Sequence, residues 1–160
     1  MEASSASPSP CEAAGPAIFA YDGSDLAGYA IEQAGLQLVA GREAIVVCVW
    51  QPADVGFLPI EGRHLHAAAA NEVEEAAKET AAHGAEIAAK AGFKARPLTV
   101  EAAPTWKGLV QVADEHKCGL IVIGSHQRSG LLGHLAGSVA AATVSHFESS
   151  VLVIHQPHSG

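Results

Sequence analysis

The run Ala44–Trp50, AIVVCVW, is the segment that most limits the folds open to this chain. It is apolar and rich in β-branched residues, and its positions do not alternate between apolar and polar. A strand with one face in water alternates in this way, whereas a strand covered on both faces does not. The run therefore predicts a central strand of a parallel sheet that has helices on both faces.

Strand and helix patterns alternate on either side of this run. A short apolar run, Ala17–Tyr21, predicts a strand that ends in the turn residues Asp22–Ser24. Apolar residues then recur at helical spacing over Asp25–Gly41, and a serine just before them is a favoured helix N-cap. The first predicted unit is therefore a strand, a tight turn and a helix.

The rest of the chain continues this alternation. Pro97 lies within one of the later apolar runs and predicts an edge strand there, because proline cannot donate to a sheet. The remaining predicted elements are a helix over Leu65–Ala91, the edge strand Phe93–Glu101, a helix from Pro104 or Thr105, a strand over Leu120–Ile123, a helix over Ser138–Phe147 and a strand over Val151–Ile154. The whole pattern predicts an α/β fold, with a five-stranded parallel sheet between helices on both faces.

A loop with two prolines and two glycines, Gln51–Arg63, joins the central strand to the longest predicted helix. It also carries apolar side chains, among them Phe57 and Leu58, which a loop of this kind would expose. We predict that Pro52–Arg63 is a lid or a partner surface.

The stretch Gly119–Ala140 is the main candidate for a ligand site. An apolar run breaks at Gly124 into a glycine-rich loop, and Ser138 then begins a helical pattern. The first N–H groups of a helix have no partner within it, and the helix dipole makes that end positive. The stretch therefore predicts a site for an anion such as a phosphate. Such sites lie beyond the carboxyl ends of parallel strands, where Asp22, Val49 and Gly124 are expected.

The length and composition of the chain indicate one domain and exclude some classes of partner. At 160 residues and 49% hydrophobic, the chain is about one domain long and can bury a core. A formal net charge of −8, with nine scattered Lys and Arg residues, argues against nucleic acid as a partner.

No apolar stretch reaches the roughly 18 residues that a membrane span requires, so no membrane association is expected. Three cysteines without metal or redox spacing fit a cytoplasmic protein, and residues 1–16 are predicted to be a disordered tail rather than a secretory signal.

Three pieces of the chain together resemble the universal stress protein family, over Ala17 to Ile154. They are the first strand with its AYDGS end, the LIVIGSH strand end, and the Gly-Ser pair that begins the last helix before the VLVI strand. The resemblance implies a universal stress protein domain over residues 17–160, with the Rossmann-type fold of the adenine nucleotide alpha hydrolases. It also implies a stress-response role and an adenine nucleotide as ligand, either ATP with or without Mg²⁺ or a smaller one such as AMP.

Nucleotide-binding members of this family carry Gly, two residues of any kind, Gly, nine residues of any kind, Gly, and then Ser or Thr. Gly124, Gly137 and Ser138 fall on this pattern, but Gln127 stands at its second glycine. If that position needs a positive φ, a side chain costs about 1–2 kcal/mol, and it also occupies space near the ligand. Two interpretations stay open: a module that binds ATP as a switch, and a homodimeric interaction protein that does not bind ATP.

Carried over position by position, the resemblance implies which residues hold the nucleoside. Asp22 would meet the polar edge of the adenine, and Val49 would pack on the base. Gly124 and His126 would flank the ribose and the phosphates. Taken alone, the turn position of Asp22 favours a structural role as a cap of the first helix, and the family resemblance reverses this preference.

The same resemblance implies a phosphate site at the start of the last helix. Gly137, Ser138 and Val139 would supply backbone amides, and Ser138 also its hydroxyl. Arg128, which lies in the loop, is our own addition, because its guanidinium would offset phosphate charge. Ser138 is also a good plain N-cap, a role that needs no ligand.

An enzymatic role is the third interpretation and has the least support. No carboxylate or nucleophile lies at a recognisable spacing from His126, and no set of metal ligands can be named. We therefore expect little or no turnover. The family resemblance further implies a homodimer, formed partly by the last strand, Val151–Ile154, pairing across a two-fold axis and so covering a sheet edge.

Overall fold

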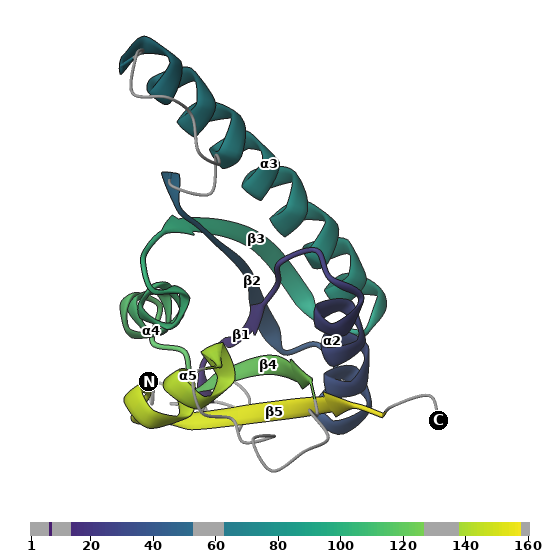
Figure 1. Ribbon diagram of the computed structural model, residues 1–160. Coiled ribbons are helices and arrows are strands. Elements are labelled where there is room, and N and C mark those ends of the chain that lie inside the picture. Colours follow the sequence, from purple (N-terminus) through teal and green to yellow (C-terminus); the bar gives the residue numbers. More distant parts are fainter. Residues whose placement is uncertain (1–6, 8–13, 53–62, 127–137, 158–160) are drawn as a thin grey trace, which may run out of the picture.

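A single sheet of five parallel strands forms the centre of the molecule (Figure 1). The computed structural model describes residue 7 and residues 14–52, 63–126 and 138–157, and of residues 63–69 only the backbone. The strands are β1 (Ala17–Ala20), β2 (Glu43–Trp50), β3 (Lys94–Glu101), β4 (Leu120–His126) and β5 (Ser150–Gln156). They follow the order β3-β2-β1-β4-β5 across the sheet, and all neighbours pair in parallel.

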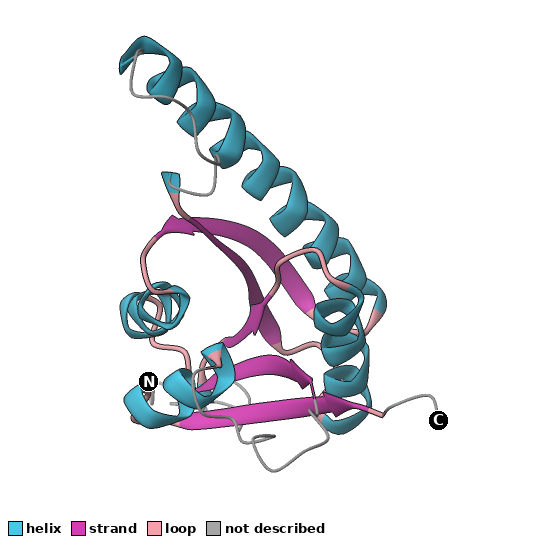
Figure 2. Cartoon of the chain, in the orientation of Figure 1, coloured by secondary structure: helices cyan, strands magenta, loops and turns pink. Residues whose placement is uncertain are grey.

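Helices cover both faces of this sheet in two pairs (Figure 2). Helices α2 (Asp25–Gln37) and α3 (Arg63–Lys90) pack on one face, and α4 (Thr105–Glu115) and α5 (Val139–His146) on the other. The N-terminal turns of α3 extend past the ends of the strands (Figure 1). The α/β fold predicted from the alternation of strand and helix patterns is therefore confirmed.

Strand β2 lies between β1 and β3, and its side chains enter both helix layers. Ala44 and Val46 pack in the layer of α2 and α3, whereas Ile45 and Val47 pack in the layer of α4 and α5. All of these side chains are buried. Because both faces are covered, the run has no polar alternation, and the predicted inner strand is confirmed.

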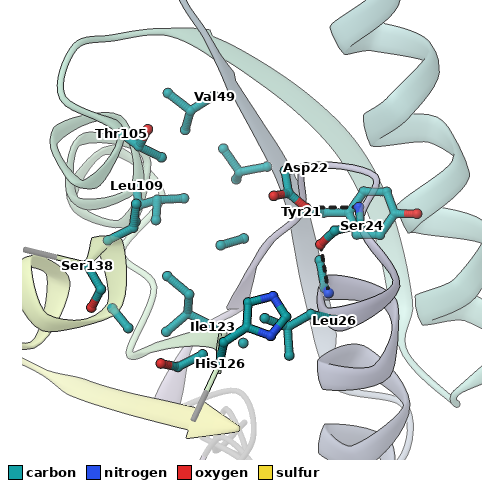
Figure 3. A pocket seen from close by; sticks show the side chains of 17 residues that line it. Tyr21, Asp22, Ser24, Leu26, Val49, Thr105, Leu109, Ile123, His126 and Ser138 are labelled. Atoms are coloured by element: carbon teal, nitrogen blue, oxygen red, sulfur yellow. Dashed lines mark hydrogen bonds between the residues drawn. The ribbon is translucent and has the colours of Figure 1, made fainter. Parts of the chain in front are cut away.

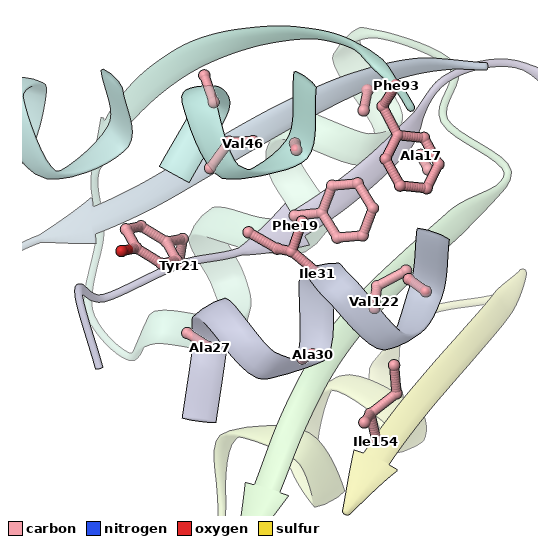
Figure 4. Close-up of a cluster of buried hydrophobic side chains, with 14 of the residues drawn as sticks. Ala17, Phe19, Tyr21, Ala27, Ala30, Ile31, Val46, Phe93, Val122 and Ile154 are labelled. Carbon is pink, nitrogen blue, oxygen red and sulfur yellow. The ribbon is translucent and has the colours of Figure 1, made fainter. Parts of the chain in front are cut away.

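The layer under α2 and α3 is built around aromatic side chains from the sheet (Figure 4). Phe19 meets Phe93 edge to face, with the ring centroids 5.0 Å apart, a favoured arrangement for two aromatic rings. Gly84 of α3 crosses close above this layer: a Cβ there would lie 2.6 Å from Tyr21 Cδ1 and 2.7 Å from Val46 Cγ1. The missing side chain therefore lets α3 approach the sheet.

Strand β3 lies at one edge of the sheet, as Pro97 predicts. Its partner in the sheet is β2, and Pro97 is opposite Val46 in the register and exposed. An edge position tolerates proline because one side of the strand donates to no neighbour.

The fourth strand is longer than its apolar run indicates, which corrects one prediction. β4 continues through Gly124 and Ser125 to His126, so Gly124 lies within the strand rather than at its end. The cause is long-range: β5 also extends to Gln156, and Gly124 pairs with Ile154. Pairing with β5 therefore extends β4 by three residues beyond the end of its apolar run.

Two predicted segments lie largely outside the described residues. The predicted lid lies, apart from its ends, outside the described residues, and so does most of the tail over residues 1–16. Among the described helices, none combines the length and the apolar character that crossing a membrane requires.

Candidate functional site

A cavity of about 350 Å³ opens beyond the carboxyl ends of β1, β2 and β4 (Figure 3). It lies where the strand order reverses between β1 and β4, which is the usual place for a ligand in an open parallel sheet. Its lining is Ala20, Tyr21, Asp22, Ser24, Leu26, Ala27, Val47, Val49, Thr105, Leu109, Ile123, Gly124, Ser125, His126, Ser138, Val139 and Ala140.

The structure brings together the candidate residues that it describes. Those that line the cavity are Asp22, Val49, Gly124, His126, Ser138 and Val139. They come from the turn after β1, from β2, from β4 and from the N-cap and first residue of α5. Gln127, Arg128 and Gly137 lie outside the described residues.

Asp22 stabilises the turn between β1 and α2 through a hydrogen bond. Its Oδ1 accepts a hydrogen bond from the Ser24 N–H at 2.9 Å, and Gly23 between them has a φ of 84°. The cap of α2 is Ser24, whose Oγ accepts from the Ala27 N–H at 3.2 Å. The interpretation of Asp22 as the helix cap is therefore wrong. Among the described residues its Oδ2 has no hydrogen-bond partner, and the side chain lines the cavity.

Ser138 caps α5 at the opposite side of the cavity. Its Oγ accepts a hydrogen bond from the Ala141 N–H at 3.0 Å, as expected for an N-cap. The next two residues, Val139 and Ala140, also line the cavity. The N–H groups in a first helical turn have no carbonyl partner within the helix, so the cavity meets the electropositive end of α5.

Gly124 allows β4 and the start of α2 to approach closely. A Cβ at this position would lie 2.8 Å from Leu26 Cγ and 3.2 Å from the Leu26 carbonyl oxygen. The glycine is therefore explained by packing against Leu26, which itself lines the cavity. Any larger residue would displace the first turn of α2 or the end of β4.

Sequence reasoning misses several lining residues that only the fold brings to the cavity. Thr105 begins α4 after the end of β3, and its helix start is the only sequence signal that points toward it. Leu109, one turn later, adds to an apolar wall with Val49 (Figure 3). Ser125 belongs to the part of β4 that lies beyond the predicted strand.

Two titratable side chains near the Asp22 carboxylate have raised pKa values: Tyr21, which lines the cavity, and Cys48, which is buried in β2. Burial, followed by the nearby Asp22 carboxylate, raises the pKa of the Tyr21 hydroxyl. Burial, again followed by Asp22, raises the pKa of the Cys48 thiol to about 11, so at neutral pH this sulfur is protonated and weakly nucleophilic. Within residues 14–52, 63–126 and 138–157, no three or more His, Cys, Asp or Glu side chains come together in a way that would hold a metal ion.

Comparisons with known proteins agree with this architecture. The model of the universal stress protein family matches residues 15–155. Among solved structures, the chain is similar to hypothetical protein MJ0577, with 21% identity, a TM-score of 0.72, and coverage of 91% of this chain and 99% of that one. No individually curated protein matches the chain.

Two further similar structures contain a nucleotide. One is a universal stress protein in complex with cAMP, with 26% identity, a TM-score of 0.64, and coverage of 90% of this chain and 99% of that one. The other is the universal stress protein from Archaeoglobus fulgidus in complex with dAMP, with 26% identity, a TM-score of 0.58, and coverage of 88% and 97%. Since the family model spans residues 15–155, the chain belongs to the universal stress protein family.

Proposed function

We propose that this protein binds an adenine nucleotide in the cavity beyond β1, β2 and β4, and that it acts as a switch in a stress response with little or no turnover. The observation that carries the proposal is the convergence of Asp22, Val49 and Ser138 on one cavity from separate elements. Similar proteins in complex with cAMP and dAMP support an adenine ligand.

The two sides of the cavity suit the two ends of a nucleotide. Val49, Leu109 and Ile123 form an apolar wall on which a base can pack. The Asp22 carboxylate, with its Oδ2 available, is an acceptor for the exocyclic amine of adenine. The cavity volume of about 350 Å³ is within the range of small-molecule sites.

The remaining roles follow the family pattern. Gly124 and His126 would flank the ribose and phosphates, and the start of α5 at Ser138 and Val139 would receive the phosphates together with Gly137. Arg128 would offset phosphate charge, and Mg²⁺ would accompany ATP. ATP occupancy would order the loop from Gly124 to Ser138 and the lid from Pro52 to Arg63. This would change a surface that a cytoplasmic protein partner recognises.

The alternative is a homodimeric interaction protein of the same family that has no ATP. Gln127 favours it, because a side chain stands at a glycine of the nucleotide-binding pattern. Both versions would pair through β5, an edge strand of the described sheet, in which Val151, Leu152 and Val153 are partly buried. We expect sedimentation to give twice the 16.3 kDa chain mass, and a 16.3 kDa species alone at high concentration would contradict this pairing.

Calorimetric titration with ATP and Mg²⁺, and with AMP, tests the proposed function directly. We expect binding heat in the wild type and an affinity about 5-fold lower in Asp22→Asn, because a neutral acceptor forms a weaker hydrogen bond than a carboxylate. Asparagine keeps the oxygen that accepts from the Ser24 N–H, so the turn should be preserved.

Asp114→Asn is the matched control for this charge change. Asp114 is exposed near the C-terminal end of α4, away from Thr105 at the cavity end of the same helix. Mass analysis of nucleotide carried through purification gives a second, independent readout. Absence of both heat and carried nucleotide in the wild type would leave only the interaction-protein alternative.

A further inference from the structure

A second hollow, of about 530 Å³, lies between the start of α4 and α5, next to the cavity. Thr105, Ser138 and Val139 line both, so the two adjoin at these residues. Thr105 and Ser138 lie on the side of the cavity opposite Asp22 (Figure 3). The other residues that line the hollow are Gln51, Pro104, Trp106, Ala141, Ala142 and Ser145. A ligand that extends from the cavity past the start of α5 would therefore reach this hollow.

The chemistry of the hollow differs from that of a phosphate site. Its lining includes Pro104, the 39% exposed Val139 and the alanines of α5, and every residue in it is uncharged. Covering a charged group with such a lining costs free energy, whereas a neutral planar group can bury its faces there. The hollow therefore suits a part of a ligand that carries no phosphate.

Trp106 supplies an aromatic surface to the hollow. It is partly buried at the start of α4, and its ring stacks on the His146 ring, with the centroids 3.8 Å apart and an interplanar angle of 16°. His146 donates a hydrogen bond from Nδ1 to the Ala142 carbonyl oxygen at 2.8 Å and does not line the hollow. The Nζ of the exposed Lys107 lies 5.8 Å from the centre of the Trp106 ring. An aromatic wall with a positive charge beside it suits a nucleobase that is linked to phosphate.

We propose that this hollow takes the second base of a dinucleoside polyphosphate, whose first adenine occupies the cavity and whose phosphates lie between the two, at the start of α5. This inference rests on the proposed function and names the class of nucleotide that the site accepts. Trp106 would stack on the second base and so distinguish dinucleoside polyphosphates from ATP and AMP. Because every base has an aromatic face, stacking of this kind does not require the second base to be adenine.

The test compares ATP with diadenosine triphosphate, which carries a second adenosine on the last phosphate of ATP, on wild type, Trp106→Leu and Trp106→Phe. Leucine keeps an apolar side chain without an aromatic face, so we expect the affinity for diadenosine triphosphate to fall roughly 5-fold. Phenylalanine keeps an aromatic ring and should retain most of this affinity. Calorimetric titration should give the same affinity for ATP in all three proteins, because Trp106 does not line the cavity that holds the first nucleoside.

The two ligands separate a contact with the second base from a structural role. An equal loss for ATP and diadenosine triphosphate would make Trp106 a packing residue between α4 and α5 and overturn the inference. Unchanged affinity of Trp106→Leu for diadenosine triphosphate, an equal loss in Trp106→Phe, or a wild type that binds only ATP would also overturn it, and the proposed function would stand. If the wild type binds neither ligand, the proposed function itself fails, and the inference fails with it.

Discussion

Replacing Gly84 by alanine is expected to lower the free energy of unfolding by about 1–2 kcal/mol, although alanine is the better helix former by about 1 kcal/mol. The added Cβ would lie 2.6 and 2.8 Å from two ring carbons of Tyr21 and 2.7 Å from Val46 Cγ1. These neighbours are a rigid ring and a β-branched side chain in the core, and both are buried. Overpacking at such a site commonly costs about 1–3 kcal/mol, so here it outweighs the gain in helix propensity. Chemical denaturation measures the difference.

Gly28→Ala is the matched control, since Gly28 is also a helix-interior glycine. A Cβ there would lie 3.6 Å from Ile87 Cδ1, an ordinary contact, so this variant should gain about 0.5–1 kcal/mol from helix propensity alone. Two glycine-to-alanine changes in neighbouring helices should therefore have opposite signs. A Gly84→Ala protein as stable as the wild type would show that α3 can move away from the sheet without loss.

The fold was predictable where burial alone determines the pattern. Ala44–Trp50 is apolar throughout because helices cover both faces of β2, and Pro97 marks an edge because an inner strand would need its N–H. These are local consequences of the architecture, so they are visible in the sequence. The parallel α/β sheet follows from them together with the regular alternation of helices.

Two features that the sequence could not predict, the length of β4 and the need for glycine at position 84, depend on contacts with residues far away in the chain. The length of β4 is set by β5, whose Ile154 pairs with Gly124. The need for glycine at position 84 is set by Tyr21 and Val46, and a helical pattern carries no trace of that contact.

The residues of the candidate site also fall into two groups, those that local sequence patterns predict and those that only the fold brings to the cavity. Asp22, Val49, Gly124 and Ser138 follow from strand-end and helix-start patterns, which are local, and the family pattern adds the part of the nucleotide that each would contact. Thr105 and Ser125 reach the same cavity only because α4 packs on the face of the sheet that contains β4. The alternative role of Asp22 as a cap could not be excluded from the sequence, because Asp22 and Ser24 both suit a helix N-cap and only the hydrogen bonds show that Ser24 caps α2.

Replacing Gln127 by glycine is expected to raise the affinity for ATP by about 10-fold, the largest effect on binding that we predict. Gln127 directly follows β4, whose last residues line the cavity, and it stands where nucleotide-binding members of the family carry glycine. A positive φ at this position would disfavour any side chain by about 1–2 kcal/mol, and the glutamine side chain would also occupy space near the ribose and phosphates. Calorimetric titration of both proteins with ATP and Mg²⁺ gives the ratio of affinities.

Gln127→Ala separates the two physical causes, because alanine removes the long side chain but keeps the Cβ. If glutamine weakens binding by filling space, alanine should recover most of the gain that glycine gives. If the backbone needs a positive φ, alanine should recover little, and only glycine should bind tightly. Binding by Gln127→Gly where the wild type shows none would mean that the natural protein is the interaction module. Unchanged affinity in a wild type that binds ATP would instead show that the loop accepts glutamine, and that the glycine of the family pattern is dispensable in this chain.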